Sequence, residues 1–230
     1  MPMKNLHLLF FLLSISLTAC AQKNAQNPYG LKVVNDFDVY KADTKSNPKD
    51  ELVEIKKEIP SVVLDIRYAT KNNFMKQVMY KQARAFARKP VVEHLKKIQA
   101  ILKKKGYGLK IFDAYRPYAI TIAFWEKASD KNFVANPAKG SKHNRGCAVD
   151  LTIIDLKTGK DVPMPTPYDS FEEAAAPHYS KLPAEIIKNR DFLISTMQAN
   201  GFKVIYNEWW HFDFIGWQDY DLMDIPFEKL

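Results

Sequence analysis

SKHNRGCAVDLTII, residues 141–154, joins a polar, glycine-containing loop to a stretch with the alternation of a β-strand. Within residues 147–154, apolar side chains occupy every second position, and Asp150 falls on the opposite face. The loop that leads into this strand carries His143. The stretch therefore predicts a strand that presents a carboxylate close to a histidine.

Helices and short strands are predicted on both sides of this strand. Three helices, each with a proline at its start, are expected over residues 90–105, 117–128 and 183–201. Further strands are expected over residues 109–112, 202–205 and 209–214. Strands and helices do not alternate regularly, so the sequence predicts an α+β fold with a small central antiparallel sheet flanked by helices, in preference to a doubly wound parallel sheet.

The first residues predict export. Lys4 followed by the mostly apolar residues 6–17 is typical of a signal peptide, here residues 1–19. Leu17-Thr18-Ala19-Cys20 fits the bacterial lipobox, in which the cysteine is lipidated and becomes the new N-terminus. We therefore expect a membrane-anchored lipoprotein that faces the periplasm or the cell exterior and is tethered through Cys20. A plain secretory signal that happens to end in cysteine is the alternative.

Composition divides the remaining chain into two parts. Residues 20–50 are rich in Asn, Lys, Asp and Gln and predict a flexible tether, whereas residues 51–230 predict one folded domain. Cys147 is the only other cysteine, so no intramolecular disulfide is expected, and we interpret it as a small buried residue. The net charge of +8 comes from scattered lysines, which indicates a solvated surface, with a mild attraction to anionic cell-wall polymer or lipid headgroups as the alternative. No nucleic-acid partner is expected outside the cytoplasm. The oligomeric state stays open.

Two of the five histidines are candidates for a metal site. His7 lies in the signal peptide, His94 is expected on an exposed helix face, and His178 is treated as a surface residue. His143, Asp150 and His211 together provide the three nitrogen and oxygen ligands that a catalytic zinc site requires. Each of the three, taken singly, also fits an ordinary polar or packed residue. Glu208 precedes His211 by three residues, close enough to act as a base on a metal-bound water.

Several motifs, taken in order, resemble one enzyme family. They are Asp-Ala-Tyr-Arg-Pro at 113–117, Ser-x-His-x-x-Gly-x-Ala-x-Asp at 141–150 and Glu-Trp-Trp-His at 208–211. Together they closely resemble the D-alanyl-D-alanine dipeptidase (VanX-type) family of zinc peptidases, over residues 59–227. The resemblance implies a Hedgehog/D,D-peptidase-like fold and one zinc ion per chain.

The resemblance also implies a role for each site residue. His143, Asp150 and His211 would bind zinc, Glu208 would be the general base and acid, and Arg116 would stabilise the tetrahedral intermediate. Asp169 would receive the free ammonium group of the substrate, Ser141 would help to orient the dipeptide, and Tyr115, like Tyr68, would line the pocket. A carboxylate aimed at an amine would exclude longer chains. A surface or helix-capping role is the alternative for Arg116, and a turn role for Asp169.

The predicted function is hydrolysis of D-Ala-D-Ala, or a similar dipeptide with a free amino end, by a zinc dipeptidase outside the cytoplasm. There it would serve peptidoglycan turnover or dipeptide salvage, because an exported enzyme cannot reach the cytoplasmic dipeptide pool. Two alternatives remain open: a D,D-carboxypeptidase that acts on peptidoglycan stem peptides, and a non-catalytic module that binds zinc or the cell wall.

Overall fold

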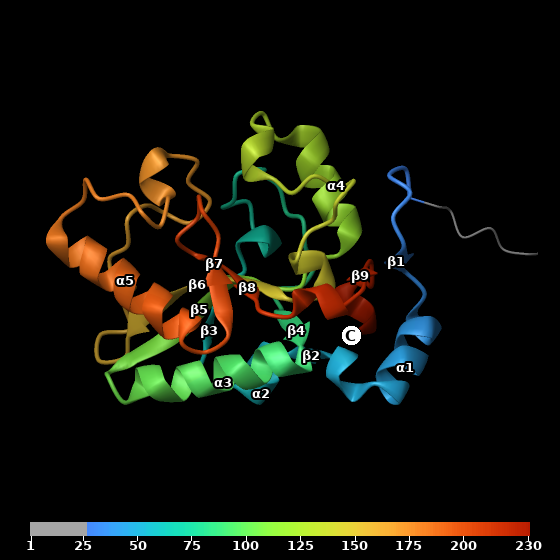
Figure 1. The fold of residues 1–230 in the computed structure, drawn as a ribbon, viewed down its shortest axis with the longest axis horizontal. Helices are drawn as coiled ribbons and strands as arrows, with labels where there is room; N and C mark the ends of the chain where they lie inside the picture. The colour runs from blue at the N-terminus through green and yellow to red at the C-terminus, as the bar shows by residue number, and fades with distance from the viewer. Residues whose placement is uncertain (1–26) are drawn as a thin grey trace, which may run out of the picture.

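The computed structural model describes residues 27–230, so the predicted signal peptide and Cys20 lie outside the described residues. Nine strands and five α-helices make up this part of the chain, shown in Figure 1. The strands are β1 (Val33–Val34), β2 (Leu52–Glu54), β3 (Val63–Leu64), β4 (Phe86–Arg88), β5 (Tyr107–Asp113), β6 (Ala148–Asp155), β7 (Phe202–Val204), β8 (His211–Phe214) and β9 (Leu222–Met223). The helices are α1 (Phe37–Ser46), α2 (Ile55–Glu58), α3 (Lys89–Lys103), α4 (Tyr118–Lys127) and α5 (Ala184–Gln198).

The central sheet has five strands in the order β3-β5-β6-β8-β7. The pairs β5–β6, β6–β8 and β7–β8 are antiparallel, and the edge pair β3–β5 is parallel. The predicted α+β class is thus confirmed, and so are the three predicted helices, which correspond to α3, α4 and α5. The parallel edge strand β3 was not predicted from the sequence. The β5–β6 register shifts between Ile111 and Asp113, and this irregularity leaves Asp113 opposite Asp150.

The two faces of the sheet differ chemically. Val149 of β6 and Phe212 of β8 are register partners, both fully buried, on the face that packs under α3 and α5. Asp150 and His211, also register partners, lie on the opposite face. Figure 1 places α4 on the other side of the sheet from α3. The alternation of side chains along β6 and β8 therefore places apolar side chains in the core and polar side chains on the opposite face of the sheet, where the site lies.

The segment before residue 51 differs from the predicted tether. β1 pairs in parallel with β9 near the C-terminus, and α1 begins after Asp36, whose carboxylate accepts hydrogen bonds from the amides of Asp38 and Val39. Tyr40 is buried, and its hydroxyl accepts a hydrogen bond from the amide of Leu52. The folded part of the chain thus begins earlier than the predicted boundary.

His94 is half-buried, so its prediction as an exposed residue is wrong. Its ring lies 5.2 Å from that of Phe214, and Nδ1 lies 2.8 Å from the carbonyl oxygen of Asn200. His178 is exposed, as predicted. Cys147 is fully buried, and burial raises the pKa of its thiol to about 12, which suits a packing role.

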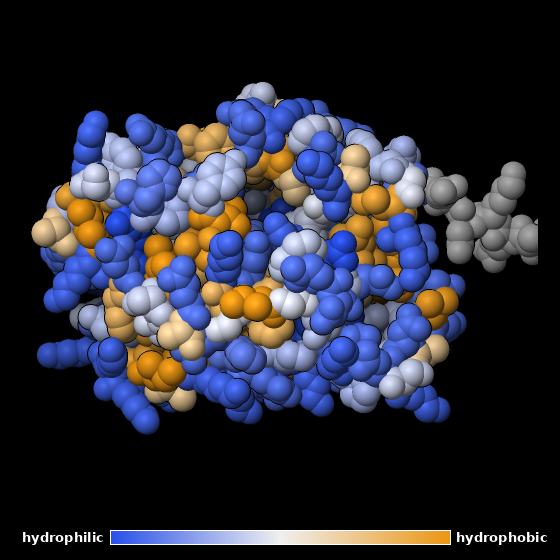
Figure 2. All heavy atoms as spheres, viewed as in Figure 1, coloured by the Kyte–Doolittle hydropathy of each residue, from blue (hydrophilic) through white to orange (hydrophobic). Residues whose placement is uncertain are grey.

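The surface is mainly hydrophilic, with small separate apolar areas on the face that Figure 2 shows. Within residues 27–230, none of the helices has the length and apolar character needed to cross a membrane.

Candidate metal centre and active site

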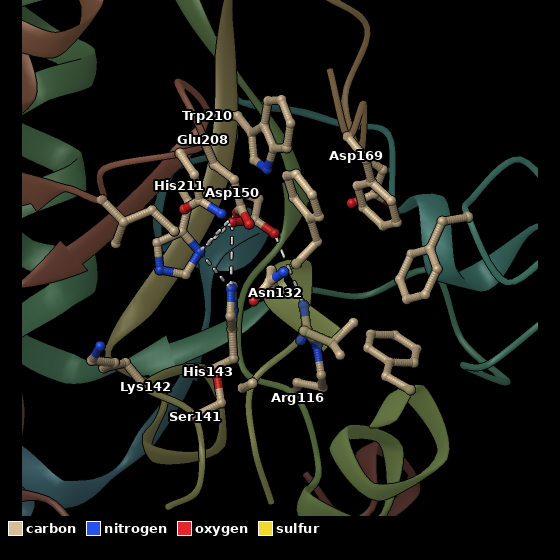
Figure 3. A pocket seen from close by; sticks show the side chains of 18 of the residues that line it. Arg116, Asn132, Ser141, Lys142, His143, Asp150, Asp169, Glu208, Trp210 and His211 are labelled. Atoms are coloured by element: carbon tan, nitrogen blue, oxygen red, sulfur yellow. Dashed lines mark hydrogen bonds and ion pairs between the residues drawn. The ribbon is translucent and has the colours of Figure 1, made fainter. Parts of the chain in front are cut away.

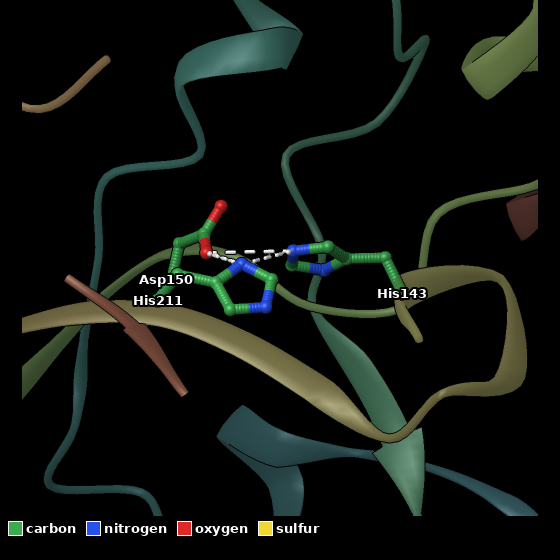
Figure 4. Close-up of side chains that lie close together, drawn as sticks. All are labelled: His143, Asp150 and His211. Atoms are coloured by element: carbon green, nitrogen blue, oxygen red, sulfur yellow. Dashed lines mark hydrogen bonds and ion pairs between the residues drawn. The ribbon is translucent and has the colours of Figure 1, made fainter. Parts of the chain in front are cut away.

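His143, Asp150 and His211 meet on the polar face of the sheet. His143 lies in the 3-10 turn His143–Arg145, Asp150 on β6 and His211 on β8 (Figure 4). Oδ1 of Asp150 lies 3.0 Å from Nδ1 of His211 and 3.4 Å from Nε2 of His143, and the two ring nitrogens are 3.2 Å apart. All three side chains are buried. The structure therefore brings the predicted ligand set together as one possible metal site.

Neighbouring acceptors fix which ring nitrogens face this site. Nδ1 of His143 lies 2.6 Å from the carbonyl oxygen of Ala114, and Nε2 of His211 lies 2.9 Å from Oδ1 of Asp213. Each of these nitrogens must carry a proton to bond its oxygen, so in the neutral form of each ring the nitrogen that faces Asp150 has a free lone pair. Oδ1 of Asp150 accepts no hydrogen bond from the described residues. Three electron-rich atoms thus converge, an arrangement that a cation would stabilise.

The pKa shifts of this cluster point the same way. Burial opposes protonation of His211, but the nearby carboxylates of Asp150, 3.0 Å from its Nδ1, and Asp213 outweigh burial and raise its pKa to about 10. Burial would raise the pKa of Asp150, yet the two histidines lower it well below its usual range. The cluster therefore attracts positive charge, whether a proton or a metal ion.

Glu208 lies at the edge of the cluster, in the loop between β7 and β8. Its Oε2 is 3.8 Å from Nδ1 of His211, too far for a hydrogen bond, so it stands beside the ligand set. Burial raises the pKa of Glu208 to about 7, and this value suits a group that gains and loses a proton near neutral pH.

Arg116 is buried at the wall of the same pocket, so the alternative of a surface arginine is excluded. Its Nε and Nη2 donate to Oδ2 of Asp113 at 3.0 and 2.7 Å. The guanidinium also lies over the rings of Tyr68 and Phe124, at 5.3 and 4.7 Å from their centroids. Nη2 lies 4.0 Å from Oδ2 of Asp150, so the positive charge stands next to the possible metal site.

Asp169 faces the pocket from a strained backbone position with a φ of 61°. The hydroxyl of Tyr68 donates to its Oδ1 at 3.1 Å, whereas its buried Oδ2 has no hydrogen-bond partner among the described residues. Burial, followed by the charges of Asp150 and Glu208, raises the pKa of Asp169 well above its usual range. A cationic group bound at Oδ2 would offset both the burial and the repulsion.

Ser141 and Tyr115, the other two predicted substrate-binding residues, differ in position. Ser141 lines the pocket, and its Oγ accepts a hydrogen bond from the amide of His143. Tyr115 is fully buried and points away from the pocket, because its hydroxyl donates to the carbonyl oxygen of Ile225 and accepts from the amide of the same residue. The prediction that Tyr115 contacts the substrate is therefore wrong. Its neighbour in the turn, Arg116, lines the pocket instead.

Three residues that the sequence did not single out hold the site together. Asp113 binds Arg116, and Asp213 binds His211 on one oxygen and Lys142 on the other, the latter at 3.4 Å. Asn144 is fully buried and donates to the carbonyl oxygen of Arg116. Asp213 could have been found, because a carboxylate two residues after a histidine on one strand lies on the same face.

One pocket of about 290 Å³ is lined by the possible metal ligands and by Glu208, Arg116, Asp169 and Ser141. Figure 3 shows the metal-site cluster at its centre, with Arg116 below and Asp169 to one side. An aromatic wall completes it, formed by Tyr68, Phe74, Phe124, Phe133 and Phe171. The pocket thus combines a possible metal site, a buried cation, an acid–base group and an unpaired carboxylate.

Residues 48–227 match a family described as D-ala-D-ala dipeptidase, the peptidase M15 family. The chain belongs to this family. A D-alanyl-D-alanine dipeptidase of Escherichia coli (strain K12) is 32% identical over 163 residues, which cover 71% of this chain and 84% of that protein. One of Enterococcus faecium is 30% identical over 168 residues, covering 64% and 83%. Membership makes the protein an enzyme of the metallo-dipeptidase class.

The solved structure of the LdcB LD-carboxypeptidase, described as revealing the molecular basis of peptidoglycan recognition, is a more remote match. It is 20% identical with a TM-score of 0.38, over 58% of this chain and 61% of that one.

Proposed function

We propose that this member of the dipeptidase family hydrolyses D-Ala-D-Ala, or a closely similar dipeptide with a free amino end, with one zinc ion per chain. The observation that carries the proposal is the unpaired, buried Oδ2 of Asp169 in the same pocket as His143, Asp150 and His211. It offers an anchor for an ammonium group beside a possible metal site. The dipeptidases from Escherichia coli and Enterococcus faecium support the choice of substrate.

Zinc suits the donor set. Two imidazoles and one carboxylate are a set that zinc accepts, and ligand atoms in a tetrahedral zinc site lie about 3.3 Å apart. The separations between the three donor atoms here are 3.0, 3.2 and 3.4 Å. Bound zinc would supply Lewis-acid chemistry, polarising the substrate carbonyl and making water more acidic.

The residues around the donor set divide the remaining chemistry. Glu208, with its pKa raised to about 7 by burial, takes a proton from the attacking water and delivers it to the leaving amine. Arg116, fixed by Asp113, donates hydrogen bonds to the oxyanion that develops at the attacked carbonyl. Asp169 accepts the substrate ammonium, and Ser141 helps to orient the dipeptide.

The amine anchor favours a dipeptidase over a D,D-carboxypeptidase. A stem peptide continues beyond the residue that would lie against Asp169, so it has no ammonium group at this point. Its neutral amide would bring no positive charge to the buried carboxylate, and a buried charge without a partner of opposite sign is costly.

Blocking the substrate amine tests this proposal. The zinc-loaded enzyme should hydrolyse D-Ala-D-Ala and leave N-acetyl-D-Ala-D-Ala almost untouched. D169N should lower kcat/KM for D-Ala-D-Ala about 100-fold, because one partner of a buried charge pair is lost. Equal hydrolysis of the free and acetylated dipeptides would contradict the amine anchor.

We further propose that the enzyme works outside the cytoplasm, in peptidoglycan turnover or dipeptide salvage, and that Cys20 anchors it to a membrane. Support comes from the sequence of residues 1–20 alone. Cells given radioactive palmitate should label the wild-type protein and retain it in the membrane fraction, whereas C20S should be unlabelled. Unlabelled wild-type protein in the cytoplasmic fraction would contradict this proposal.

A further inference from the structure

A groove opens beside the catalytic pocket and continues it. It has a volume of about 560 Å³ and is lined by the ends of β7 and β8 and the turn that follows β8. Lys142, Ile205 and Tyr206 line both the pocket and the groove, whereas Lys203 and Trp217 line the groove alone. The two hollows therefore share a wall, and a ligand in one can extend into the other. We call this second hollow the leaving-side groove.

The leaving-side groove lies away from the amine anchor. In Figure 3, Asp169 and Lys142 stand on opposite sides of the cluster formed by His143, Asp150 and His211. Asp169 lines the pocket but not the groove. A substrate with its ammonium at Asp169 and its peptide bond at the metal site therefore directs its leaving residue toward Lys142 and the groove.

The groove has an excess of positive charge. Lys142 and Lys203 line it, and its one acidic lining residue, Asp213, is already bound by His211 and by Lys142. Lys203 is exposed, and it is the register partner of Asp213, so the two side chains lie on the same sheet face. Unlike Asp213, Lys203 has no ion-pair partner within the described part of the chain.

Exposed apolar side chains border the same groove. Tyr206 and Ile215 have exposed fractions of 75% and 64%, and the ring of Trp217 lies 5.3 Å from Nζ of Lys142. Such side chains provide packing area for the methylenes of a leaving residue larger than alanine. The groove thus combines a cation with an apolar border.

We propose that the leaving-side groove is the subsite for the leaving residue of the substrate and that it selects residues with an acidic side chain. This inference rests on the proposed function and extends it from D-Ala-D-Ala to dipeptides with an acidic second residue. Lys142, nearer the metal site, suits the terminal carboxylate of the dipeptide, and Lys203 suits the side-chain carboxylate.

The test compares D-Ala-D-Glu with its neutral isostere D-Ala-D-Gln on the zinc-loaded enzyme, with D-Ala-D-Ala as reference. The ratio of kcat/KM for D-Ala-D-Glu to that for D-Ala-D-Gln should be about fivefold in the wild type, the upper range for an exposed ion pair. K203Q should bring the ratio close to one, and K203R should preserve it. K97Q, which removes a similarly exposed lysine from α3, should leave the ratio unchanged. Added salt should lower the wild-type ratio.

The outcomes separate this inference from the proposed function. If the enzyme hydrolyses D-Ala-D-Ala but cleaves the Glu and Gln dipeptides at equal rates, the groove does not select acidic residues. The proposed dipeptidase function would be unaffected by this result. A ratio that K203Q and K97Q change equally would also overturn selection by the groove, since the effect would then come from overall charge. No hydrolysis of D-Ala-D-Ala would overturn the proposed function itself.

Discussion

Arg116 shows how one residue of the site depends on another. Its guanidinium lies against two aromatic rings and makes two hydrogen bonds to a single oxygen of Asp113. The other oxygen of Asp113 accepts a hydrogen bond from Tyr80 at 2.8 Å. Both carboxylate oxygens are thus engaged, so the direction in which the guanidinium points depends on Asp113 and Tyr80, neither of which lines the pocket.

Asp113→Asn tests this positioning role. The amide keeps the shape but loses the charge and one acceptor, so Arg116 should shift and meet the oxyanion poorly. We expect kcat to fall about 100-fold with little change in KM, because small misplacements of catalytic groups slow the chemical step by about this factor. Steady-state kinetics on D-Ala-D-Ala at matched zinc content provide the measurement. An unchanged kcat, or a rise in KM alone, would contradict the role.

Some site residues could be predicted from the sequence, and others could not. The metal-site residues, Glu208 and Arg116 could be proposed because several motifs, taken in order, resemble those of a known dipeptidase family. Tyr115 was assigned wrongly because the side-chain direction in an irregular turn is set by distant contacts, here with Ile225. The support given by Asn144 could not be predicted, since it joins segments that the sequence separates.

At the scale of elements, the longest ones were the most predictable. α3 and β6 have apolar patterns over many residues, and their predicted bounds agree closely with the observed ones. β1, β2 and β4 have two or three residues each, and they exist because of pairing with distant partners. α1 was missed because its sequence is largely polar, with Tyr40 as its buried residue.

The β2–β4 pair shows how such short elements are stabilised. Glu54 at the end of β2 accepts hydrogen bonds from Nε and Nη2 of Arg84, at 3.0 and 2.8 Å. Arg84 also donates to the carbonyl oxygens of Phe227 and Leu230. One charge pair thus connects β2 to the C-terminal end of the chain.

This pair predicts a pH-dependent stability. The hydrogen bond from Arg84 lowers the pKa of Glu54 from 4.5 to about 2. The folded state therefore favours the ionised form, and the pair stabilises the fold above pH 4.5 but not below pH 2. Glu54→Gln should lower the free energy of unfolding by about 1–2 kcal/mol at pH 7. Urea denaturation at several pH values should show the difference shrinking toward pH 2, whereas a constant difference would contradict the account.

At the scale of the whole molecule, the fold concentrates negative charge around the pocket. Asp113, Asp150, Asp169, Asp213 and Glu208 all lie in or next to the site, and Arg116 is the buried cation among them. Such a cluster destabilises the fold unless positive charge is added. A bound metal ion would therefore stabilise the folded chain as well as serve the reaction.

Metal binding should be visible as heat stability. Zinc in large excess over its dissociation constant should raise Tm by about 10 °C, from a stabilisation of about 4 kcal/mol in a chain of this size. His143→Gln should abolish the rise, and His178→Gln, at an exposed histidine outside the pocket, should preserve it. Differential scanning calorimetry with added zinc and with a chelator measures the two Tm values. The same Tm in both conditions would contradict a bound metal.

The central claim is that one zinc ion and Glu208 together hydrolyse a free dipeptide. The most direct measurement titrates metal-free protein with zinc while following the release of D-alanine from D-Ala-D-Ala and from a stem pentapeptide, for wild type and Glu208→Ala. Wild-type activity on the dipeptide should saturate at one zinc per chain with the pentapeptide left intact. Glu208→Ala should bind the same zinc and lose at least about 100-fold in kcat. Preferential cleavage of the pentapeptide, or full activity of the zinc-loaded Glu208→Ala variant, would contradict the account.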